Sequence, residues 1–290
     1  MIPALPAGLL LTGFFLVPIG FIIFYSFGYK PGLLSSIGVD RLSLDRYGEA
    51  LNDTFLLTFG NTLQIALLGT ALCLFIAYPF AYWLSHHVAS RYRSTLLAVV
   101  LVPLWTNFLL RTIGWQIILS GDGWLSKALM SAGIIHQPLN ILFTRDAVEI
   151  GVVYNYLIFM ILPLYVVLER MDPSLRQASR DLGAGRLRTF LQVTFPLSMP
   201  GVVAGCLLVF VPLCGDYITA SILGGASANM AGQLVAAQFL MAQNWALGSA
   251  TAVVLIIAII MTVLAAGAGL AIVTAVLRAH RSVTLPGAVN

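Results

Sequence analysis

The chain has 290 residues, of which 59% are hydrophobic and only 9% carry a charge, and its formal net charge is +4. Soluble domains contain about 25% charged residues, so this composition excludes a soluble globular protein. The hydrocarbon core of a membrane is about 30 Å thick and needs about 20 apolar residues per helix. The sequence therefore predicts an all-α polytopic membrane protein with six transmembrane helices, over Leu5–Phe27, Thr62–Leu84, Leu96–Leu119, Ala147–Leu168, Pro200–Leu223 and Ser249–Leu277.

The first apolar run is interpreted as a retained transmembrane helix. No basic segment precedes it, it has no A-x-A-like cleavage site, and it is longer than the apolar part of a signal peptide. The following segment SLDRYGEAL predicts a short surface helix with Ser43 as its N-cap. Another short helix is expected at Trp124–Ala132, ended by Gly133. No repeat or linker interrupts the chain, so a single transmembrane domain over residues 1–290 is expected.

The basic residues are unevenly divided between the loops on the two sides of the membrane. With six spans, one side holds nine of them: Arg91, Arg93, the five arginines of the loop at about 169–199, Arg278 and Arg281. The other side holds five: Lys30, Arg41, Arg46, Lys127 and Arg145. The positive-inside rule therefore places both termini and the arginine-rich loop in the cytoplasm. Because flanking charge accounts for these arginines, no nucleic-acid partner is expected.

The arginine-rich loop, with the sequence RQASRDLGAGRLRTFLQVTFPLSMPG at its centre, predicts two short amphipathic helices. Asp172 before Pro173 is typical of a helix start. An apolar ridge follows at helical spacing, and Gly183 is expected to end this helix in the left-handed conformation. The second piece, RLRTFLQV, is expected to end before the prolines at 196 and 200. Two interpretations remain open: an interfacial element resting on anionic membrane lipid, or a docking element for a cytoplasmic partner.

This loop resembles the EAA loop of bacterial ABC importer permeases. Gln177-Ala178-Ser179 stands at the E-A-A positions, Gly183 at the glycine and Phe195-Pro196-Leu197 with Pro200 at the ending, so Gln and Ser replace the family's Glu and second Ala. Further stretches, including VPLWTNFLLRTIGW and GCLLVFVPLCGDYITASILGG, are similar to the first permease of spermidine/putrescine importers. These stretches lie within roughly residues 60 to 255.

The resemblance implies a type I ABC importer permease that forms half of a polyamine translocation pathway in a bacterial inner membrane. Its expected partners are a second, homologous permease, two copies of a cytoplasmic ATPase and an extracytoplasmic substrate-binding protein. The loop would be the coupling helix, and the residues implied in ATPase coupling are Leu175, Gln177, Ala178, Ser179, Leu182, Gly183 and Arg186. No Walker A loop occurs, since neither Lys30 nor Lys127 follows a glycine. The chain is therefore expected to be no enzyme and to bind no cofactor, with ATP bound by the partner.

Candidate residues of the substrate pathway are those within or beside the spans that carry a charge, a polar group or an aromatic face. Asp216 with Tyr217 beside it offers an ion pair and a cation–π contact to an alkylammonium group. The other candidates are Trp105, Asn107, Tyr154 and Tyr156. Arg111 is predicted to lie at a depth similar to that of Asp216, so an intramembrane pair between the two is possible, with snorkelling of Arg111 to the outer headgroups as the alternative.

Other functions remain as alternatives. Within ABC importers the substrate would be another small amine, an opine or an anion. An ion-coupled secondary transporter would use intramembrane charges such as Arg111 and Asp216, but it gives no reason for the bent amphipathic loop. A membrane enzyme is disfavoured because the four histidines form no catalytic motif. The three cysteines lie in apolar runs, so neither a disulfide framework nor a metal site is expected.

Overall fold

The computed structural model describes residues 5–32, 35–225 and 228–281, and these ranges are mostly helical, with only isolated β-bridges in the loop after the first helix. The contacts within the chain divide it into two compact units. The terminal unit comprises Met1–Asn52 and Ala237–Asn290, and the central unit comprises Asp53–Ala236. The single domain expected from the sequence stays a prediction.

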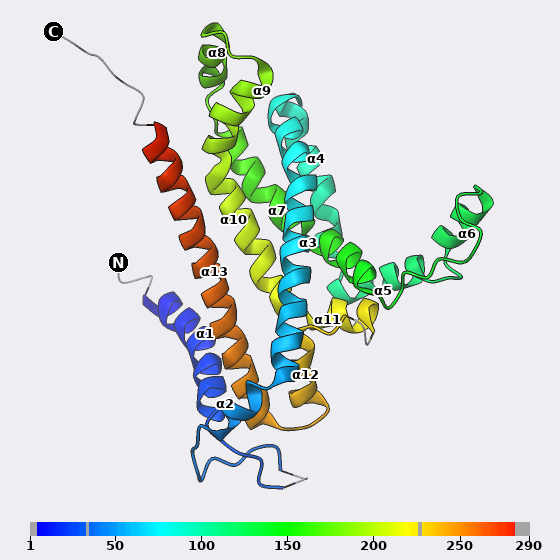
Figure 1. The fold of residues 1–290 in the computed structure, drawn as a ribbon, viewed down its shortest axis with the longest axis vertical. Coiled ribbons are helices and arrows are strands. Elements are labelled where there is room, and N and C mark those ends of the chain that lie inside the picture. Colours follow the sequence, from blue (N-terminus) through cyan, green and yellow to red (C-terminus); the bar gives the residue numbers. More distant parts are fainter. Residues whose placement is uncertain (1–4, 33–34, 226–227, 282–290) are drawn as a thin grey trace, which may run out of the picture. The chain divides into compact units, whose positions relative to one another are not determined.

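The terminal unit consists of α1 (Leu5–Tyr25), α2 (Asp45–Ala50) and the long α13 (Trp245–Arg281) (Figure 1). Both α1 and α2 pack against α13. The loop between them is tied to the segment just before α13, since Lys30 Nζ donates to the Ala242 carbonyl at 2.7 Å. The predicted surface helix is present as α2 but begins at Asp45, whose N–H donates to the Ser43 hydroxyl at 3.4 Å.

The central unit is built on three long helices, α3 (Asp53–His86), α7 (Arg145–Glu169) and α10 (Phe195–Cys214), which pack against one another (Figure 1). Small residues allow this close approach. A Cβ atom added at Gly201 of α10 would lie 2.9 Å from the Pro163 carbonyl oxygen of α7. Small residues at such contacts let the backbones of membrane helices come close together.

The predicted span Leu96–Leu119 is not one continuous helix, because the helix breaks in its middle. It consists of α4 (Ser90–Leu101), a 3-10 turn at Val102–Trp105 and α5 (Phe108–Leu119). The helices on the two sides of the break are bent by 88°. Pro103 supplies no N–H, Thr106 is extended, and the Asn107 side chain accepts from Leu109 N at 2.8 Å to start a new helix.

A short helix, α6 (Trp124–Ser131), follows α5 and lies away from the three long helices in Figure 1. It ends where the sequence predicted, because Gly133 adopts a φ of +69°. This left-handed conformation costs glycine nothing.

The predicted span Pro200–Leu223 also differs from the structure at both ends. Pro196 and Pro200 do not break the helix: α9 (Arg186–Thr189) continues through a π-helical turn at Phe190–Thr194 into α10. The π turn at Phe190–Thr194 directly precedes Pro196 and accommodates its missing N–H, so the helix continues into α10. At the other end α10 stops at Cys214 and is followed by α11 (Tyr217–Thr219), a second π turn and α12 (Ala231–Leu240).

Four of the helical stretches are long and apolar enough to cross a membrane: Asp53–His86, Arg145–Glu169, Arg186–Cys214 and Trp245–Gly269. The bent pair of α4 and α5 raises the number to five if it forms one span. Within α1, Leu10–Tyr25 forms a shorter apolar helix. The structure thus confirms a polytopic helical protein, while six spans and cytoplasmic termini stay predictions.

Candidate functional site

The arginine-rich loop begins with the capped helix that its sequence predicted. This helix is α8 (Pro173–Asp181), and the Asp172 carboxylate accepts a hydrogen bond from Ser174 N at 2.9 Å. Because this bond favours the ionised carboxylate, it holds the pKa of Asp172 below its usual value. The interaction satisfies one of the free N–H groups at the start of α8.

The end of α8 is also as predicted. Gly183 has a φ of +81° and its N–H donates to the Arg180 carbonyl at 2.8 Å. Ala184 N donates to the Ser179 carbonyl at 3.1 Å, which completes a Schellman motif. The hydroxyls of Ser179 and Thr189 lie 3.1 Å apart and link α8 to α9. Together these bonds fold the loop into a compact helix–turn–helix.

The apolar ridge of α8, defined as Leu175, Ala178 and Leu182, is exposed. Leu182 is the extreme case, with 89% of its surface accessible, and no residue of α8 is buried. Gln177 is exposed as well. An exposed apolar ridge of this kind marks a surface that contacts either a protein partner or the membrane.

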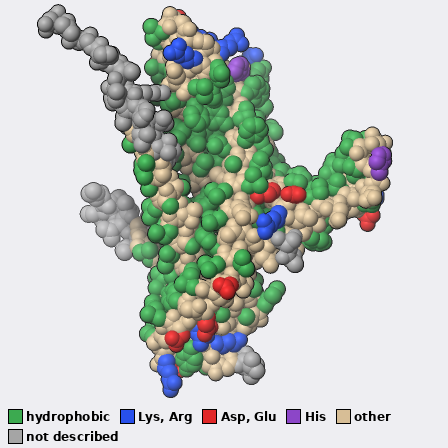
Figure 2. Space-filling model, viewed as in Figure 1, with side chains coloured by type: hydrophobic (Ala, Val, Ile, Leu, Met, Phe, Trp, Pro, Cys, Tyr) green, Lys and Arg blue, Asp and Glu red, His purple; other side chains and the backbone are tan. Residues whose placement is uncertain are grey.

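Basic side chains gather on the same loop. Figure 2 shows basic side chains, all of them arginines, at the end of the central unit that α8 and α9 form, whereas hydrophobic side chains cover much of the long helices. Arg186, one of the implied coupling residues, belongs to this cluster and lines a pocket with Arg176 and Arg180. The loop therefore combines an exposed apolar ridge with a concentrated positive charge.

Asp216 is buried where the chain breaks between α10 and α11. Only 6% of its surface is accessible. Its carboxylate accepts from Thr219 N at 3.0 Å and from the Thr219 hydroxyl at 2.6 Å, so it caps α11. Gly232 of α12 packs tightly here, because an added Cβ atom would lie 2.5 Å from the Gly215 carbonyl oxygen. The carboxylate thus sits in a rigid break with its oxygens already engaged.

The structure brings one other predicted pathway residue to Asp216. Tyr156 of α7 is buried, and its hydroxyl interacts with the Asp216 carboxylate. The Tyr156 ring packs edge-on against Phe108 of α5, with centroids 6.2 Å apart. Tyr156 and Phe108 therefore connect α5 and α7 beside the break that holds Asp216.

The remaining pathway candidates are dispersed. Tyr154 packs against Trp115 with ring centroids 5.4 Å apart, and Tyr217 is exposed beside Asp216. Trp105 is 88% exposed at the break between α4 and α5, and Asn107 acts there as the N-cap of α5. The structure therefore groups Asp216 with Tyr156 and the adjacent Tyr217, whereas Tyr154, Trp105 and Asn107 make their described contacts elsewhere.

No ion pair joins Arg111 to Asp216 within residues 5–32, 35–225 and 228–281. The Arg111 guanidinium lies over the Phe108 ring, 5.5 Å from its centroid, and Arg111 Nε has no hydrogen-bond partner. A cation above an aromatic face is partly stabilised by the ring quadrupole. Pairing of the two residues stays a prediction.

Sequence reasoning missed Glu149, which lies inside the predicted span Ala147–Leu168. Its residue surface is 8% exposed, and its Oε2 atom has no hydrogen-bond partner. An added Cβ atom at Gly69 of α3 would lie 3.3 Å from Oε2, so the carboxyl group is inserted between α3 and α7. The signal was present, because a carboxylate flanked by apolar residues inside a span is expensive and points to a specific role.

A bundle of membrane-length helices with an exposed, amphipathic loop at one end defines the class of polytopic helical membrane proteins. The chain belongs to the family of binding-protein-dependent transport system inner membrane components, which matches residues 77–271. It is accordingly a multi-pass protein of the bacterial inner membrane.

The chain is also similar to individual proteins of known type. The chain is 41% identical over 215 residues to the spermidine/putrescine transport system permease protein PotB of Escherichia coli K12, covering 74% of this chain and 78% of the relative. It is 39% identical over 240 residues to PotB of Haemophilus influenzae, covering 83% of each. The inner membrane ABC transporter permease protein YdcU of Escherichia coli is 31% identical over 177 residues, which are 57% of this chain and 56% of YdcU.

Solved structures share the fold. A bacterial ABC transporter involved in the import of the acidic polysaccharide alginate is similar with a TM-score of 0.61 at 20% identity, over 90% of this chain and 92% of that chain. The same kind of transporter in complex with an alginate pentasaccharide-bound periplasmic protein has a TM-score of 0.66 at 14% identity, over 90% and 89% of the two chains.

Proposed function

We propose that the chain is the transmembrane permease subunit of an ATP-driven ABC importer and forms half of the translocation pathway for polyamines such as spermidine and putrescine. The observation that carries this proposal is the identity of about 40% to PotB over most of both chains. The folded, exposed loop of α8 and α9 supports it independently, because an ATP-driven permease needs a surface through which a separate ATPase acts on it.

The full assembly follows from this proposal. The chain crosses the membrane six times with both termini in the cytoplasm, and it pairs with a second, homologous permease. Two copies of an ATPase bind ATP and dock on the cytoplasmic side, since this sequence lacks a Walker A loop. A substrate-binding protein delivers polyamine from outside; a related alginate transporter has been solved with such a periplasmic protein.

Coupling uses the helix–turn–helix described above. The exposed ridge of α8 enters an apolar groove on the ATPase, and Gln177 and Arg186 contact the rim of that groove. Burial of apolar side chains stabilises such a contact by about 25 cal/mol per Å². Because α9 continues without interruption into α10, a movement of the docked loop is transmitted directly into the bundle of α3, α7 and α10.

Substrate recognition uses the break between α10 and α11. A polyamine carries several ammonium groups, which are stabilised by a carboxylate and by aromatic faces. Asp216 provides the carboxylate, Tyr156 and Tyr217 flank it, and Trp105, Asn107 and Tyr154 complete the proposed pathway. The substrate ammonium group then replaces part of the hydrogen bonding that Thr219 gives to Asp216.

Purification of the affinity-tagged chain from native membranes tests this assignment. The expected result is a complex that contains an ATPase and a second permease, and whose ATPase activity rises when a polyamine-loaded binding protein is added. A chain that purifies from these membranes alone, or with an ATPase that no polyamine stimulates, would contradict the proposal.

A further inference from the structure

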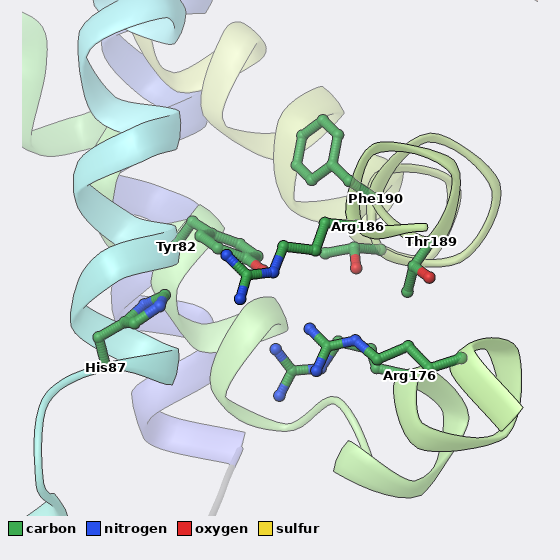
Figure 3. A pocket seen from close by; sticks show the side chains of 8 residues that line it. Tyr82, His87, Arg176, Arg186, Thr189 and Phe190 are labelled. Atoms are coloured by element: carbon green, nitrogen blue, oxygen red, sulfur yellow. The ribbon is translucent and has the colours of Figure 1, made fainter. Parts of the chain in front are cut away.

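A polar cavity of about 430 Å³ lies behind the arginine-rich loop in the central unit. Tyr82 near the end of α3 and His87 just after it form one wall, and Phe190 of the π turn forms part of another. The remaining wall is supplied by Arg176 and Arg180 of α8 and by Arg186 of α9. In Figure 3 the side chains of Arg176 and Arg186 extend from the loop toward Tyr82 and His87.

The charge of this cavity is uncompensated. No acidic residue lines it, and within the described ranges the ion pairs are Arg46 with Glu49 and Arg93 with Glu169. None of the three pocket arginines therefore has a carboxylate partner in the part of the chain that the structure describes. Guanidinium groups that converge without a counter-charge repel one another. A bound anion removes this repulsion.

Two further observations indicate that the cavity is built for a polar ligand. Thr194 lines it, is only 1% exposed, and its hydroxyl has no hydrogen-bond partner. The Nε atom of Arg176 is also shielded from solvent and has no partner. Buried polar groups are nearly always hydrogen-bonded, and a ligand that reaches these two donors from the cavity would supply the missing acceptor.

The donors also define the class of the anion. A single carboxylate is satisfied by one guanidinium fork, whereas a tetrahedral phosphate presents oxygens in several directions and accepts from several arginines and hydroxyls at once. The volume lies within the range of about 300–1,000 Å³ usual for small-ligand sites. The rings of Tyr82 and Phe190, which meet edge-on with centroids 6.0 Å apart, add an apolar surface beside the charges.

We infer that the pocket formed by Arg176, Arg180, Arg186 and Thr194 binds a phosphate group, carried by an anionic phospholipid headgroup or by a free phosphate anion. The bound group ties α8 and α9 to the end of α3 and thereby sets the position of the apolar ridge. This inference does not depend on which substrate the permease carries.

The experiment uses the full chain in detergent and two probes. In the first arm, thermal unfolding is followed during titration with inorganic phosphate, against chloride at equal ionic strength. In the second arm, native mass spectrometry compares retention of phosphatidylglycerol with retention of phosphatidylcholine. Binding in the first arm only identifies a free anion, and preferential retention in the second identifies the lipid headgroup; either result supports the site.

Variants test whether the binding occurs in this pocket. Arg176→Gln and Arg186→Gln should each lower the affinity for the probe about tenfold or more, because each removes charge-assisted hydrogen bonds. Thr194→Val, which keeps the charge and the shape, should weaken it more modestly. The matched control is Arg188→Gln, since Arg188 lies in the same loop but donates to Gln192 at 3.2 Å and does not line the cavity.

Two outcomes would overturn the inference. The first is that neither probe binds the unmodified chain. If Arg176→Gln in addition lowers the binding of an ATPase, the arginines serve protein docking instead. The second is an equal loss in Arg188→Gln, which would reduce the effect to the general charge of the loop.

Discussion

Replacement of Gly183 by valine should weaken docking of the ATPase without preventing membrane insertion. Gly183 has a φ of +81°, and a Cβ atom built on it meets nothing within 4 Å. The cost of a side chain is therefore purely conformational, about 1–2 kcal/mol for a residue forced into the left-handed region. If the loop relieves this strain by losing the Schellman motif, the ridge is no longer held in its docking orientation. A cost of this size lowers the fraction of molecules whose loop can dock by roughly 5- to 30-fold.

The assay is titration of the purified ATPase onto the detergent-solubilised permease complex, with the apparent Kd as readout. Gly183→Asn should retain most of the affinity, because asparagine tolerates the left-handed region better than other residues. Gly185→Ala is the matched control, since Gly185 has an ordinary φ of −66° and free space around its Cβ position. An unchanged Kd for Gly183→Val, or an equal loss for Gly185→Ala, would show that the turn at Gly183 does not orient the ridge.

Four further substitutions have defined outcomes. Ala178→Asp places a charge on the exposed ridge and should abolish co-purification of the ATPase while insertion stays normal; normal co-purification would argue against docking through α8. Asp216→Asn should assemble normally and lose polyamine uptake, with spermidine affected at least as strongly as putrescine; near-normal uptake per complex would limit Asp216 to capping α11. Gly201→Ala should destabilise the bundle by about 1–3 kcal/mol through overpacking against Pro163, seen as a lower Tm than that of the control Gly60→Ala, whose Cβ position is open. Asn107→Ala should cost about 1 kcal/mol through loss of the cap of α5, and an unchanged Tm would contradict that role.

The sequence predicted those features that depend on neighbouring residues. Asp172 with Pro173, and Gly183 at the end of a helical apolar pattern, specify a start and a stop that need no tertiary contact, and both are present in the structure. The same holds for Gly133 after α6. Local backbone chemistry therefore sufficed for the ends of the short helices.

Breaks and continuations of the helices inside the long apolar runs were predicted poorly. The mean hydropathy of Leu96–Leu119 conceals Pro103 and Asn107, which break the helix and start a new one. Conversely, Pro196 and Pro200 were interpreted as breaks, but the π turn before them lets the helix continue. A hydropathy window measures transfer to lipid and carries no information about backbone geometry.

In the candidate site, too, some features could be predicted from neighbouring residues and others depend on how the helices pack. Asp216 could be selected because an acid inside an apolar run is costly, whereas its contact with Tyr156 depends on how α7 and α10 pack. Its role as the cap of α11 was within reach, because Thr219 follows three residues later. The arginine pocket could not be predicted from the sequence, since Tyr82 near the end of α3 and His87 just after it lie far from the loop along the chain.

The decisive measurement for the proposed function is uptake of labelled spermidine into proteoliposomes that contain the complete complex and its binding protein. We expect uptake that requires ATP on the ATPase side, is insensitive to collapse of ion gradients, and is abolished by Ala178→Asp. Uptake that proceeds without ATP and follows an imposed ion gradient would instead identify an ion-coupled transporter and contradict the proposal.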